Sequence, residues 1–356
     1  MQKQKQKLYL DSGYLNFDYL INLPVDFIYV VGGRGTGKTY GALAWLKEHN
    51  MLYTYMRRTQ TQLDMVTNPF FSPLKPINED YGCNIQPLPI AKGCCALYNC
   101  DKDGKPETGE PLGFTCALST VANLRGFNIE EVKITIFDEF IGENHERPIK
   151  GEAGAFYNAY ETINRNRELK GKPALKMICL ANSNNIANPI FMDLELVNIA
   201  QTMLDKKQEV RILKDKNCAI VMLFDSPISK LKTDTALYRM TKNSAFYKMA
   251  ISNDFGQAYS NIGSKRLIEY KPVVNVGELT IYKHKSKDEY YCTTHASGVC
   301  PRYTAAERDL KLFNNNFAWL RISYYLSNTI CFESPICEVL LDKYFRDGAK
   351  ISSRKS

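Results

Sequence analysis

The sequence predicts an α/β protein whose first domain contains a parallel-rich sheet. Three observations lead to this fold class. A β-branched and aromatic segment at 25–31 runs directly into the glycine-rich segment GGRGTGKT, which is followed by the helix-like segment YGALAWLKEHN. A second apolar segment at 51–56 comes after a gap that suits a parallel strand–helix–strand crossover. Later apolar segments stop at polar residues, as strands do at the carboxyl edge of a parallel sheet, where α/β proteins bind ligands.

The elements after the second strand follow in order along the chain. Residues 68–112 are rich in Pro, Gly, Asn and Cys, with a weak strand pattern at 96–98, so we expect an inserted hairpin or an irregular excursion. A helix is expected where Phe156, Tyr160 and Ile163 share one side. The remaining strands of the domain are predicted at 114–118, 132–137, 175–180 and 219–224.

Length and composition indicate more than one domain. The chain has 356 residues, 44% of them hydrophobic and 24% charged, which excludes a mini-protein and wholesale disorder. We assign residues 1–228 to the first domain and 229–262 to a basic helical linker, with Leu237, Met240, Phe246 and Met249 as a possible apolar side. From 263 onward, short alternating strands joined by Lys-rich turns predict a smaller α+β domain that ends in a frayed tail.

The sequence also indicates a cellular compartment. It contains no run of about 18 apolar residues, and its start lacks the apolar segment of a signal peptide. Its 11 cysteines are an odd number without regular spacing, so we expect a soluble protein of a reducing cytoplasm. The cysteine groupings at 94–100 and 292–300 lack the paired spacing of structural zinc sites.

The net charge of +8 is unevenly distributed. Residues 1–228 contain 26 Lys and Arg against 26 Asp and Glu, whereas residues 229–356 contain 20 against 12. This excess favours a polyanionic partner for the C-terminal region, although a basic surface that serves solubility is the alternative. Aromatic residues such as Tyr290 and Trp319 are interleaved there with Lys and Arg, a mixture that suits either nucleic-acid contact or a domain core.

The glycine-rich segment matches G-x-x-x-x-G-K-[ST] between a strand and a helix, the context that a phosphate-binding loop requires. Glycines let consecutive backbone N–H groups surround phosphates, and the following helix N-terminus favours negative charge. Lys38 is expected to reach the β- and γ-phosphates of ATP, and Thr39 to ligate Mg²⁺. The residues of the predicted loop are Gly32, Gly33, Arg34, Gly35, Thr36, Gly37, Lys38 and Thr39.

A carboxylate pair follows the apolar segment ITIF at the end of the third predicted parallel strand. Asp138 is expected to hold the Mg²⁺ through water, and Glu139 to polarise the attacking water. A nucleotide-binding switch needs only the Asp, so the pair argues for hydrolysis. A nucleotide-binding regulatory module without turnover remains the alternative.

Further polar residues complete the predicted site. Asn182 follows the next strand and is expected to sense the γ-phosphate. An arginine that neutralises transition-state charge is also expected, since such a residue raises the rate by several powers of ten. The candidates are Arg34 acting in cis, Arg165 or Arg167 acting on a neighbouring subunit, and Arg125.

With GGRGTGKT, the LRG segment at 124–126, IFDE at 136–139 and LANSN at 180–184 in this order, the chain resembles the DNA-packaging ATPases of tailed phages, the terminase large subunit family. It is most similar to the short encapsidation ATPases of protein-primed podoviruses. The resemblance covers about 25–228 with specific motifs. It implies an ASCE-type P-loop domain, the loop, carboxylate and coupling roles given above, and Arg165 or Arg167 as the trans-acting residue.

The resemblance also implies partners and a location. Such motors form rings, typically pentamers, on the portal vertex of a prohead and translocate double-stranded DNA, in some cases with a structural RNA. The expected location is therefore the host cytoplasm and, transiently, the portal vertex. A phage assembly ATPase of the membrane-anchored kind is a rival that the lack of an apolar span disfavours.

Terminases that cut DNA carry an RNase H-like nuclease domain, and the resemblance implies a degenerate form of it at 263–356. The candidate first strand, at 273–280, lacks a central Asp, and no acidic triad is evident downstream. We therefore expect a domain adapted to binding without nuclease activity. A nuclease-competent terminase is the alternative.

Overall fold

A computed structural model gives the chain as two compact units, each described here by itself. They comprise Met1–Leu194 with Ile199–Phe255, and Glu195–Asn198 with Gly256–Ser356. The structure describes residues 7–124, 129–142, 146, 149–182, 186–224, 226–228, 233, 235–242, 247, 261–327 and 329–350.

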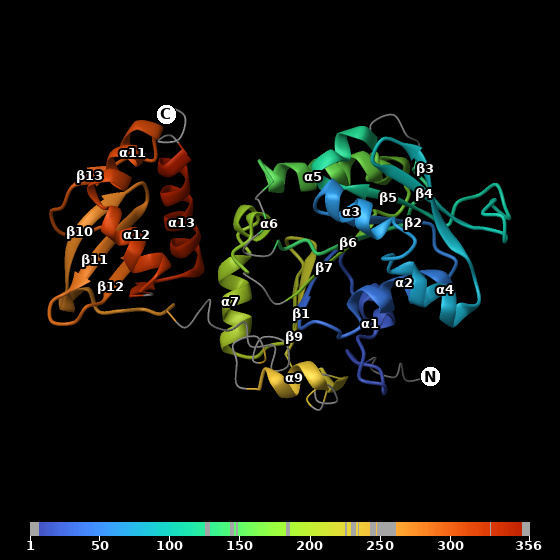
Figure 1. Cartoon of the computed structure of the whole chain (residues 1–356), viewed down its shortest axis with the longest axis horizontal. Helices are drawn as coiled ribbons and strands as arrows, with labels where there is room; N and C mark the ends of the chain where they lie inside the picture. Colours follow the sequence, from blue (N-terminus) through green and yellow to red (C-terminus); the bar gives the residue numbers. More distant parts are fainter. Residues whose placement is uncertain are drawn as a thin grey trace. The chain divides into compact units, whose positions relative to one another are not determined.

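The first unit is organised around a sheet of nine strands, counted over its described residues, in the order β3-β4-β5-β2-β6-β7-β1-β9-β8 (Figure 1). The strands from β5 to β9 in this order run parallel, and β3, β4 and β8 are antiparallel additions at the two edges. The predicted parallel-rich sheet is thus confirmed, and the segment expected as a hairpin forms β3 and β4. The bounds are β1 (Phe27–Gly32), β2 (Tyr53–Arg57), β3 (Ile85–Ala91), β4 (Cys94–Asn99), β5 (Gly113–Ala117), β6 (Ile134–Asp138), β7 (Lys176–Asn182), β8 (Val210–Leu213) and β9 (Cys218–Leu223).

Helices cover both faces of this sheet, which explains why its central strands are apolar without alternation. On one face, Leu20, Leu43 and Ile77 from three helices pack against strand residues such as Ile28. On the other face, aromatic rings of the strands and helices pack together; they belong to Tyr29, Phe137, Phe140, Phe156 and Phe191. The helices are α1 (Phe17–Ile21), α2 (Lys38–Glu48), α3 (Gln60–Val66), α4 (Leu74–Tyr81), α5 (Glu152–Asn164), α6 (Pro189–Asp193) and α7 (Val197–Asp205), with 3₁₀ turns at Leu118–Leu124 and Arg167–Lys170.

The predicted helical linker at 229–262 falls mostly outside the described residues. Within its described part lies the short helix α9 (Ala236–Met240). Leu237 and Met240, which we expected on an apolar side, are exposed. Phe246 and Met249, the other two members of that side, lie outside the described residues.

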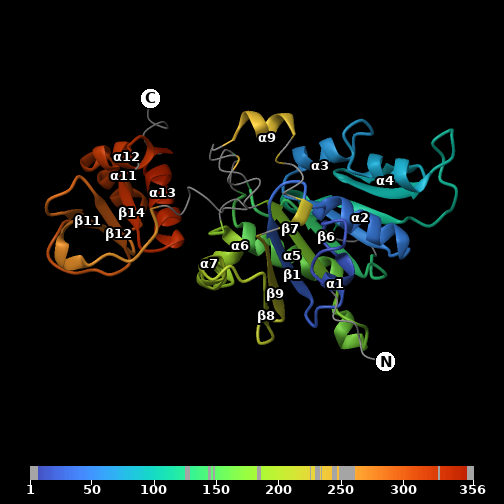
Figure 2. The same cartoon turned by 90° about the horizontal axis from the view of Figure 1, so that it is seen from below.

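The second unit is α+β. Its sheet, over the described residues, has the order β13-β10-β11-β12-β14 and comprises β10 (Tyr270–Val276), β11 (Leu279–His284), β12 (Tyr290–Thr293), β13 (Arg302–Tyr303) and β14 (Ile330–Phe332). β10, β11 and β12 form an antiparallel meander, while β13 runs parallel to β10 and β14 parallel to β12. The helices α11 (Glu307–Asn316), α12 (Ala318–Tyr325) and α13 (Pro335–Lys350) lie on one face of this sheet (Figures 1 and 2).

The aromatic residues of the second unit divide between its core and its surface. Tyr290 and Tyr291 are buried, whereas Trp319 is 39% exposed. The ammonium of Lys283 lies 5.5 Å from the ring centroid of Tyr290. Among the described residues, no helix is both long and apolar enough to span a membrane.

A candidate nucleotide site at the carboxyl edge of the sheet

The loop between β1 and α2 has the backbone of a phosphate-binding turn. Gly35 and Gly37 have φ angles of +67° and +84°, a region that residues with a side chain rarely adopt. Gly37 directly precedes α2, so the first N–H groups of that helix face the loop. The backbone N–H of Leu15 donates to the carbonyl of Thr36 and fixes the loop from the N-terminal side.

Lys38 is the buried cation of the site, with 7% of its surface exposed. Its Nζ donates to the carbonyls of Gly32 and Gly33 at 2.9 and 2.7 Å and lies 3.4 Å from Oδ1 of Asn182. The ammonium therefore points back into its own loop, where neutral oxygens satisfy it. An anion held by the loop would offer it a stronger, charge-assisted partner.

Asp138 ends β6 and is the buried anion of the site, at 4% exposure. Its Oδ2 accepts hydrogen bonds from Oγ1 of Thr39 at 2.9 Å, from the hydroxyl of Tyr55 at 2.6 Å and from the Arg57 guanidinium at 3.0 Å. A threonine hydroxyl beside a carboxylate is an oxygen donor pair of the kind that Mg²⁺ prefers. The residues present thus fit a magnesium ion.

Glu139 differs from Asp138 in backbone and exposure. Its φ of +56° is uncommon for a residue with a side chain, and such strain clusters at functional positions. Its carboxylate is 41% exposed and accepts from the Arg57 guanidinium at 2.5 Å. The backbone turn directs the second carboxylate out of the sheet edge toward the cavity, while Asp138 stays buried.

Arg57, the last residue of β2, joins the two carboxylates. Its side chain is 12% exposed, with one guanidinium nitrogen on Asp138 and the other on Glu139. Burial would lower the pKa of the Arg57 guanidinium, but Tyr55, Asp138 and Glu139 outweigh it and the pKa is raised. We did not predict this residue as part of the site, although its position at the end of a strand that pairs with β6 is a signal that could have found it.

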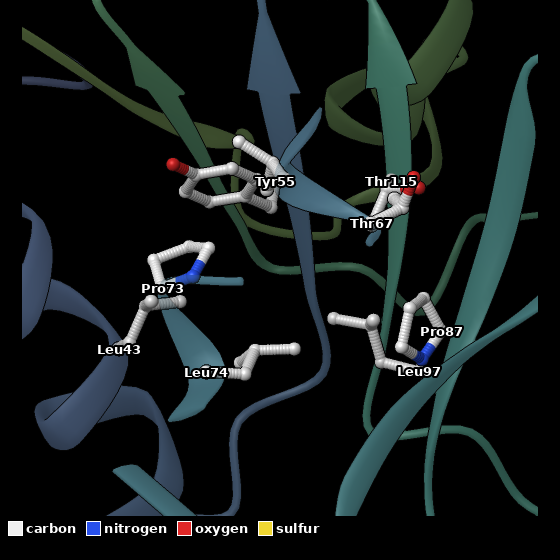
Figure 3. A pocket seen from close by; sticks show the side chains of 9 residues that line it. Leu43, Tyr55, Thr67, Pro73, Leu74, Pro87, Leu97 and Thr115 are labelled. Carbon is white, nitrogen blue, oxygen red and sulfur yellow. The ribbon is translucent and has the colours of Figure 1, made fainter. Parts of the chain in front are cut away.

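Tyr55, a residue of β2, donates a hydrogen bond from its hydroxyl to Asp138. The ring of Tyr55 lines a small cavity of about 10 Å³, together with apolar side chains that include Leu43, Leu74 and Leu97 (Figure 3). This volume has room for at most one water molecule. Burial, followed by the charge of Asp138, raises the pKa of the Tyr55 hydroxyl well above its usual value, so it stays a hydrogen-bond donor.

A second buried ionic cluster lies next to the first. Nε and one terminal nitrogen of Arg58 donate to the two carboxylate oxygens of Glu152, the first residue of α5, at 2.6 and 3.0 Å. The same guanidinium pairs with Glu146, which also accepts from Gln62 of α3. These contacts attach α3 and α5 to the end of β2, so the start of α5 is fixed close to the carboxyl edge of the sheet.

The predicted arginines lie in different places. Arg34 is exposed and lines the cavity above the loop. Arg165 and Arg167 follow α5 at the amino edge of the sheet, because Asn164 accepts from the N–H of Leu175, just before β7. Arg167 is 4% exposed and donates to the carbonyls of Asn164 and Glu130, whereas Arg165 is half-buried. Arg125 and the Ser183–Asn185 segment lie outside the described residues.

An open cavity of about 320 Å³ lies at the carboxyl ends of β1, β6 and β7. Its volume is in the range of small-molecule sites, and it combines buried cations and anions with loop N–H groups, as a nucleotide requires. Arg165 and Arg167 are not brought to it within this chain. Its lining residues are Arg34, Gly35, Gly37, Lys38, Thr39, Tyr40, Asp138, Glu139, Ala181 and Asn182.

Comparison with curated proteins finds relatives of one kind. The chain is 24% identical over 257 residues to the DNA packaging protein of Bacillus phage phi29, an alignment that covers 70% of this chain and 67% of that protein. It is 28% identical over 188 residues to the DNA packaging protein of Bacillus phage B103, covering 51% of this chain and 50% of that protein.

Solved structures show the same fold over nearly the full length. The chain of the bacteriophage phi29 viral genome packaging motor assembly matches with a TM-score of 0.61 and 20% identity, covering 94% of this chain and 99% of that chain. The Phi-28 gp11 DNA packaging motor matches with a TM-score of 0.56 and 18% identity, covering 95% and 98%. The family model of the podovirus DNA encapsidation protein (Gp16) matches residues 9–286, and the chain therefore belongs to that family.

Proposed function

We propose that this chain is an ATP-hydrolysing subunit of a viral DNA-packaging motor, which couples hydrolysis to the movement of double-stranded DNA through a portal into a prohead. Membership of the encapsidation family supports the process. The single observation that carries the chemistry is the contact between Thr39 and Asp138 beside Lys38 and Glu139, at one cavity. The substrate is ATP and the required ion is Mg²⁺, with Thr39 and Asp138 as its protein ligands.

The residues of the cavity have separate roles in the proposed reaction. Mg²⁺ supplies charge neutralisation between the phosphates when it is bound. The loop N–H groups and Lys38 hold the phosphate chain. Asn182, which contacts Lys38, senses the γ-phosphate at the end of that chain. Glu139 orients the attacking water and accepts its proton. Arg57 is a positioning residue, because its guanidinium binds both carboxylates and so fixes the carboxylate of Glu139 at the cavity.

We assign the trans-acting arginine to Arg165. Arg167 is engaged with two backbone carbonyls and buried, which fits a structural role. Arg165 is more exposed and has a φ of +46°, and Asn166 after it has a φ of +56°. Arg165 is the left-handed C-cap of α5, with its N–H bonded to the carbonyl of Glu161, so its backbone is fixed at the helix end. Arg34, in the loop itself, is the candidate in cis.

A trans-acting arginine requires a neighbouring subunit, which supports a homo-oligomeric ring. Because Arg165 lies at the opposite sheet edge from Lys38 of its own chain, it serves only another copy's cavity. We propose a ring, in pentameric form, that works on the portal in the host cytoplasm, with a structural RNA as a further partner.

The C-terminal unit is proposed to bind rather than cut. We infer an RNase H-like ancestry from its antiparallel meander with a parallel strand beside the first strand, β10. The positive excess of residues 229–356 supports a polyanion as a ligand of this region of the chain. Incubation of the protein with plasmid DNA and Mg²⁺ or Mn²⁺ should leave the DNA intact. Cleavage that depends on a C-terminal carboxylate would support a nuclease-competent terminase instead.

Equilibrium binding and turnover of ATP test the proposed chemistry. Wild-type protein should bind ATP with Mg²⁺ and hydrolyse it. Lys38→Ala should lose affinity, whereas Glu139→Gln should keep affinity and lose turnover. Equal turnover by wild type and Glu139→Gln would instead indicate a nucleotide-binding module without catalysis by this residue.

A further inference from the structure

The three side chains that donate to Asp138 differ in what else they contact. Oδ2 of Asp138 accepts from Thr39, Tyr55 and Arg57 at 2.9, 2.6 and 3.0 Å. Thr39 is also the second proposed ligand of Mg²⁺, and Arg57 also binds Glu139. Within the described part of the chain, the hydroxyl of Tyr55 contacts Asp138 and the Arg57 guanidinium, which lies 3.5 Å away. Tyr55 therefore acts on Asp138, whereas the other two donors also act on Mg²⁺ or on Glu139.

The strand register brings Tyr55 to Asp138. β2 and β6 are parallel neighbours, and Tyr55 pairs with Ile136, two residues before Asp138. Side chains two residues apart in a strand point to the same face of the sheet, so Tyr55 and Asp138 share the face that α2 and α4 cover. The length of the tyrosine side chain covers the rise between the two positions, and its hydroxyl meets Oδ2 of Asp138.

The ring of Tyr55 is held in place by packing. Tyr55 is 2% exposed, and its ring lines the same small cavity as apolar side chains that include Leu43, Leu74 and Leu97 (Figure 3). A tyrosine side chain has only two rotatable torsions, and close packing fixes both. A buried hydroxyl among apolar groups needs a hydrogen-bond partner. The packed ring thus presents its hydroxyl to Asp138 as a donor at a fixed position.

The carboxylate of Asp138 is bonded at both oxygens. Oδ1 accepts from the backbone N–H of Glu139 at 3.1 Å, while Oδ2 accepts from Tyr55. The terminal torsion of an aspartate is otherwise broad, so a carboxylate without these bonds could turn away from Thr39. With both oxygens bonded, Oδ2 stays beside the Thr39 hydroxyl. The orientation of Asp138 is therefore set before any ion binds.

We propose that Tyr55 is a positioning residue for Mg²⁺ binding: its hydroxyl holds the Asp138 carboxylate in the orientation that, together with Thr39, receives the ion. The proposal rests on the proposed function, because it concerns the metal ion of the same ATP site. Hydrogen-bond partners behind a metal ligand change metal affinity by about ten- to a hundred-fold, since they fix the orientation of the ligand. The phosphate contacts of Lys38 and the loop do not depend on Tyr55.

Calorimetric titration of the full chain with ATP, once with saturating Mg²⁺ and once in EDTA, tests this role without relying on turnover. Tyr55→Phe keeps the ring and removes the hydroxyl. With Mg²⁺, the variant should bind ATP about ten- to a hundred-fold more weakly than wild type, because the ion loses an oriented ligand. In EDTA, which removes the ion, the two proteins should bind ATP equally, and this equality excludes misfolding as the cause.

Tyr53→Phe is the matched control. Tyr53 is a buried tyrosine two residues earlier in the same strand, and its ring packs against Gly113 at the other end of β2. This variant should bind ATP as wild type does under both conditions. Equal weakening by Tyr55→Phe with Mg²⁺ and in EDTA, no weakening in either, or the same loss in Tyr53→Phe would overturn the role of Tyr55. If wild type binds no ATP, or binds it no better with Mg²⁺ than in EDTA, the proposed function itself fails.

Discussion

At the scale of single residues, the contact between Arg57 and Glu139 fixes the carboxylate that we propose as the general base. The structure has one guanidinium between two carboxylates with different tasks, one buried and one directed at the cavity. Arg57 binds Oε2 of Glu139 and so holds the proposed general base in a fixed position at the cavity.

Arg57→Lys should lower kcat for ATP hydrolysis and leave KM nearly unchanged. Lysine keeps the charge but cannot contact both carboxylates through a planar fork, so the position of Glu139 is lost while the phosphate contacts of Lys38 remain. Steady-state kinetics with Mg²⁺ measure the split. A higher KM at unchanged kcat would contradict a positioning role and place Arg57 among the binding residues.

Glu139→Gln should reduce kcat by about 10²- to 10⁴-fold, the range for loss of a general base, and leave ATP affinity intact. The amide has the same shape but accepts no proton. Asp138→Asn serves as the contrasting variant, because it should weaken Mg²⁺-dependent ATP binding as well. Equal loss of ATP affinity in both variants would contradict the separate roles that we propose for the two carboxylates.

The elements of the fold show which features the sequence could reveal. β1, the glycine loop and α2 were predictable because a β-branched run, positive-φ glycines and a helical segment occupy adjacent positions. Asp138 and Glu139 were predictable from the end of an apolar strand. Arg58 and Glu152 were not, because the pair is 94 positions apart in sequence and only the folded sheet brings α5 to the end of β2. The same applies to Tyr14, whose ring lies next to Gly37 only in the folded chain.

Arg58→Ala should destabilise the first unit by about 3–5 kcal/mol, the range for leaving a buried charge without its partner. Glu152 is 3% exposed and would lose both hydrogen bonds to the guanidinium. Chemical denaturation monitored by far-UV circular dichroism measures this loss. Arg346→Ala breaks a more exposed pair with Asp342 on α13 and should cost about 1 kcal/mol or less. Similar costs for both variants would contradict the role given to the buried cluster.

α13 should make the second unit sensitive to pH. Burial, followed by the charge of Asp342, raises the pKa of Glu338 to about 7 from a usual 4.5. The folded state therefore retains a proton that the unfolded state releases. The contribution of Glu338 to the free energy of unfolding is thus largest at low pH and is lost as the pH rises through about 4.5 to 7. Melting temperatures of wild type and Glu338→Gln across this window should converge at low pH and diverge above it, with the variant more stable. Parallel curves would contradict the assignment.

At the scale of the whole molecule, residues 1–228 balance their Lys and Arg against Asp and Glu, whereas residues 229–356 carry the positive excess. The short strands from about residue 263 onward could be predicted from the sequence, and β10 to β14 lie there. The helical connection and the tail could not be tested, because most of 229–262 and all of 351–356 lie outside the described residues. Under the proposed function, ATP is bound at the carboxyl edge of the first sheet, and the positive excess of residues 229–356 is the proposed contact for a polyanion.

Steady-state ATP hydrolysis, measured with and without double-stranded DNA at low and high salt, tests the central claim most directly. We predict that DNA stimulates turnover, that the stimulation falls steeply as salt rises because phosphate contacts release counterions, and that Glu139→Gln abolishes it. Turnover that is identical with and without DNA at both salt concentrations would contradict the claim that this ATPase works on DNA.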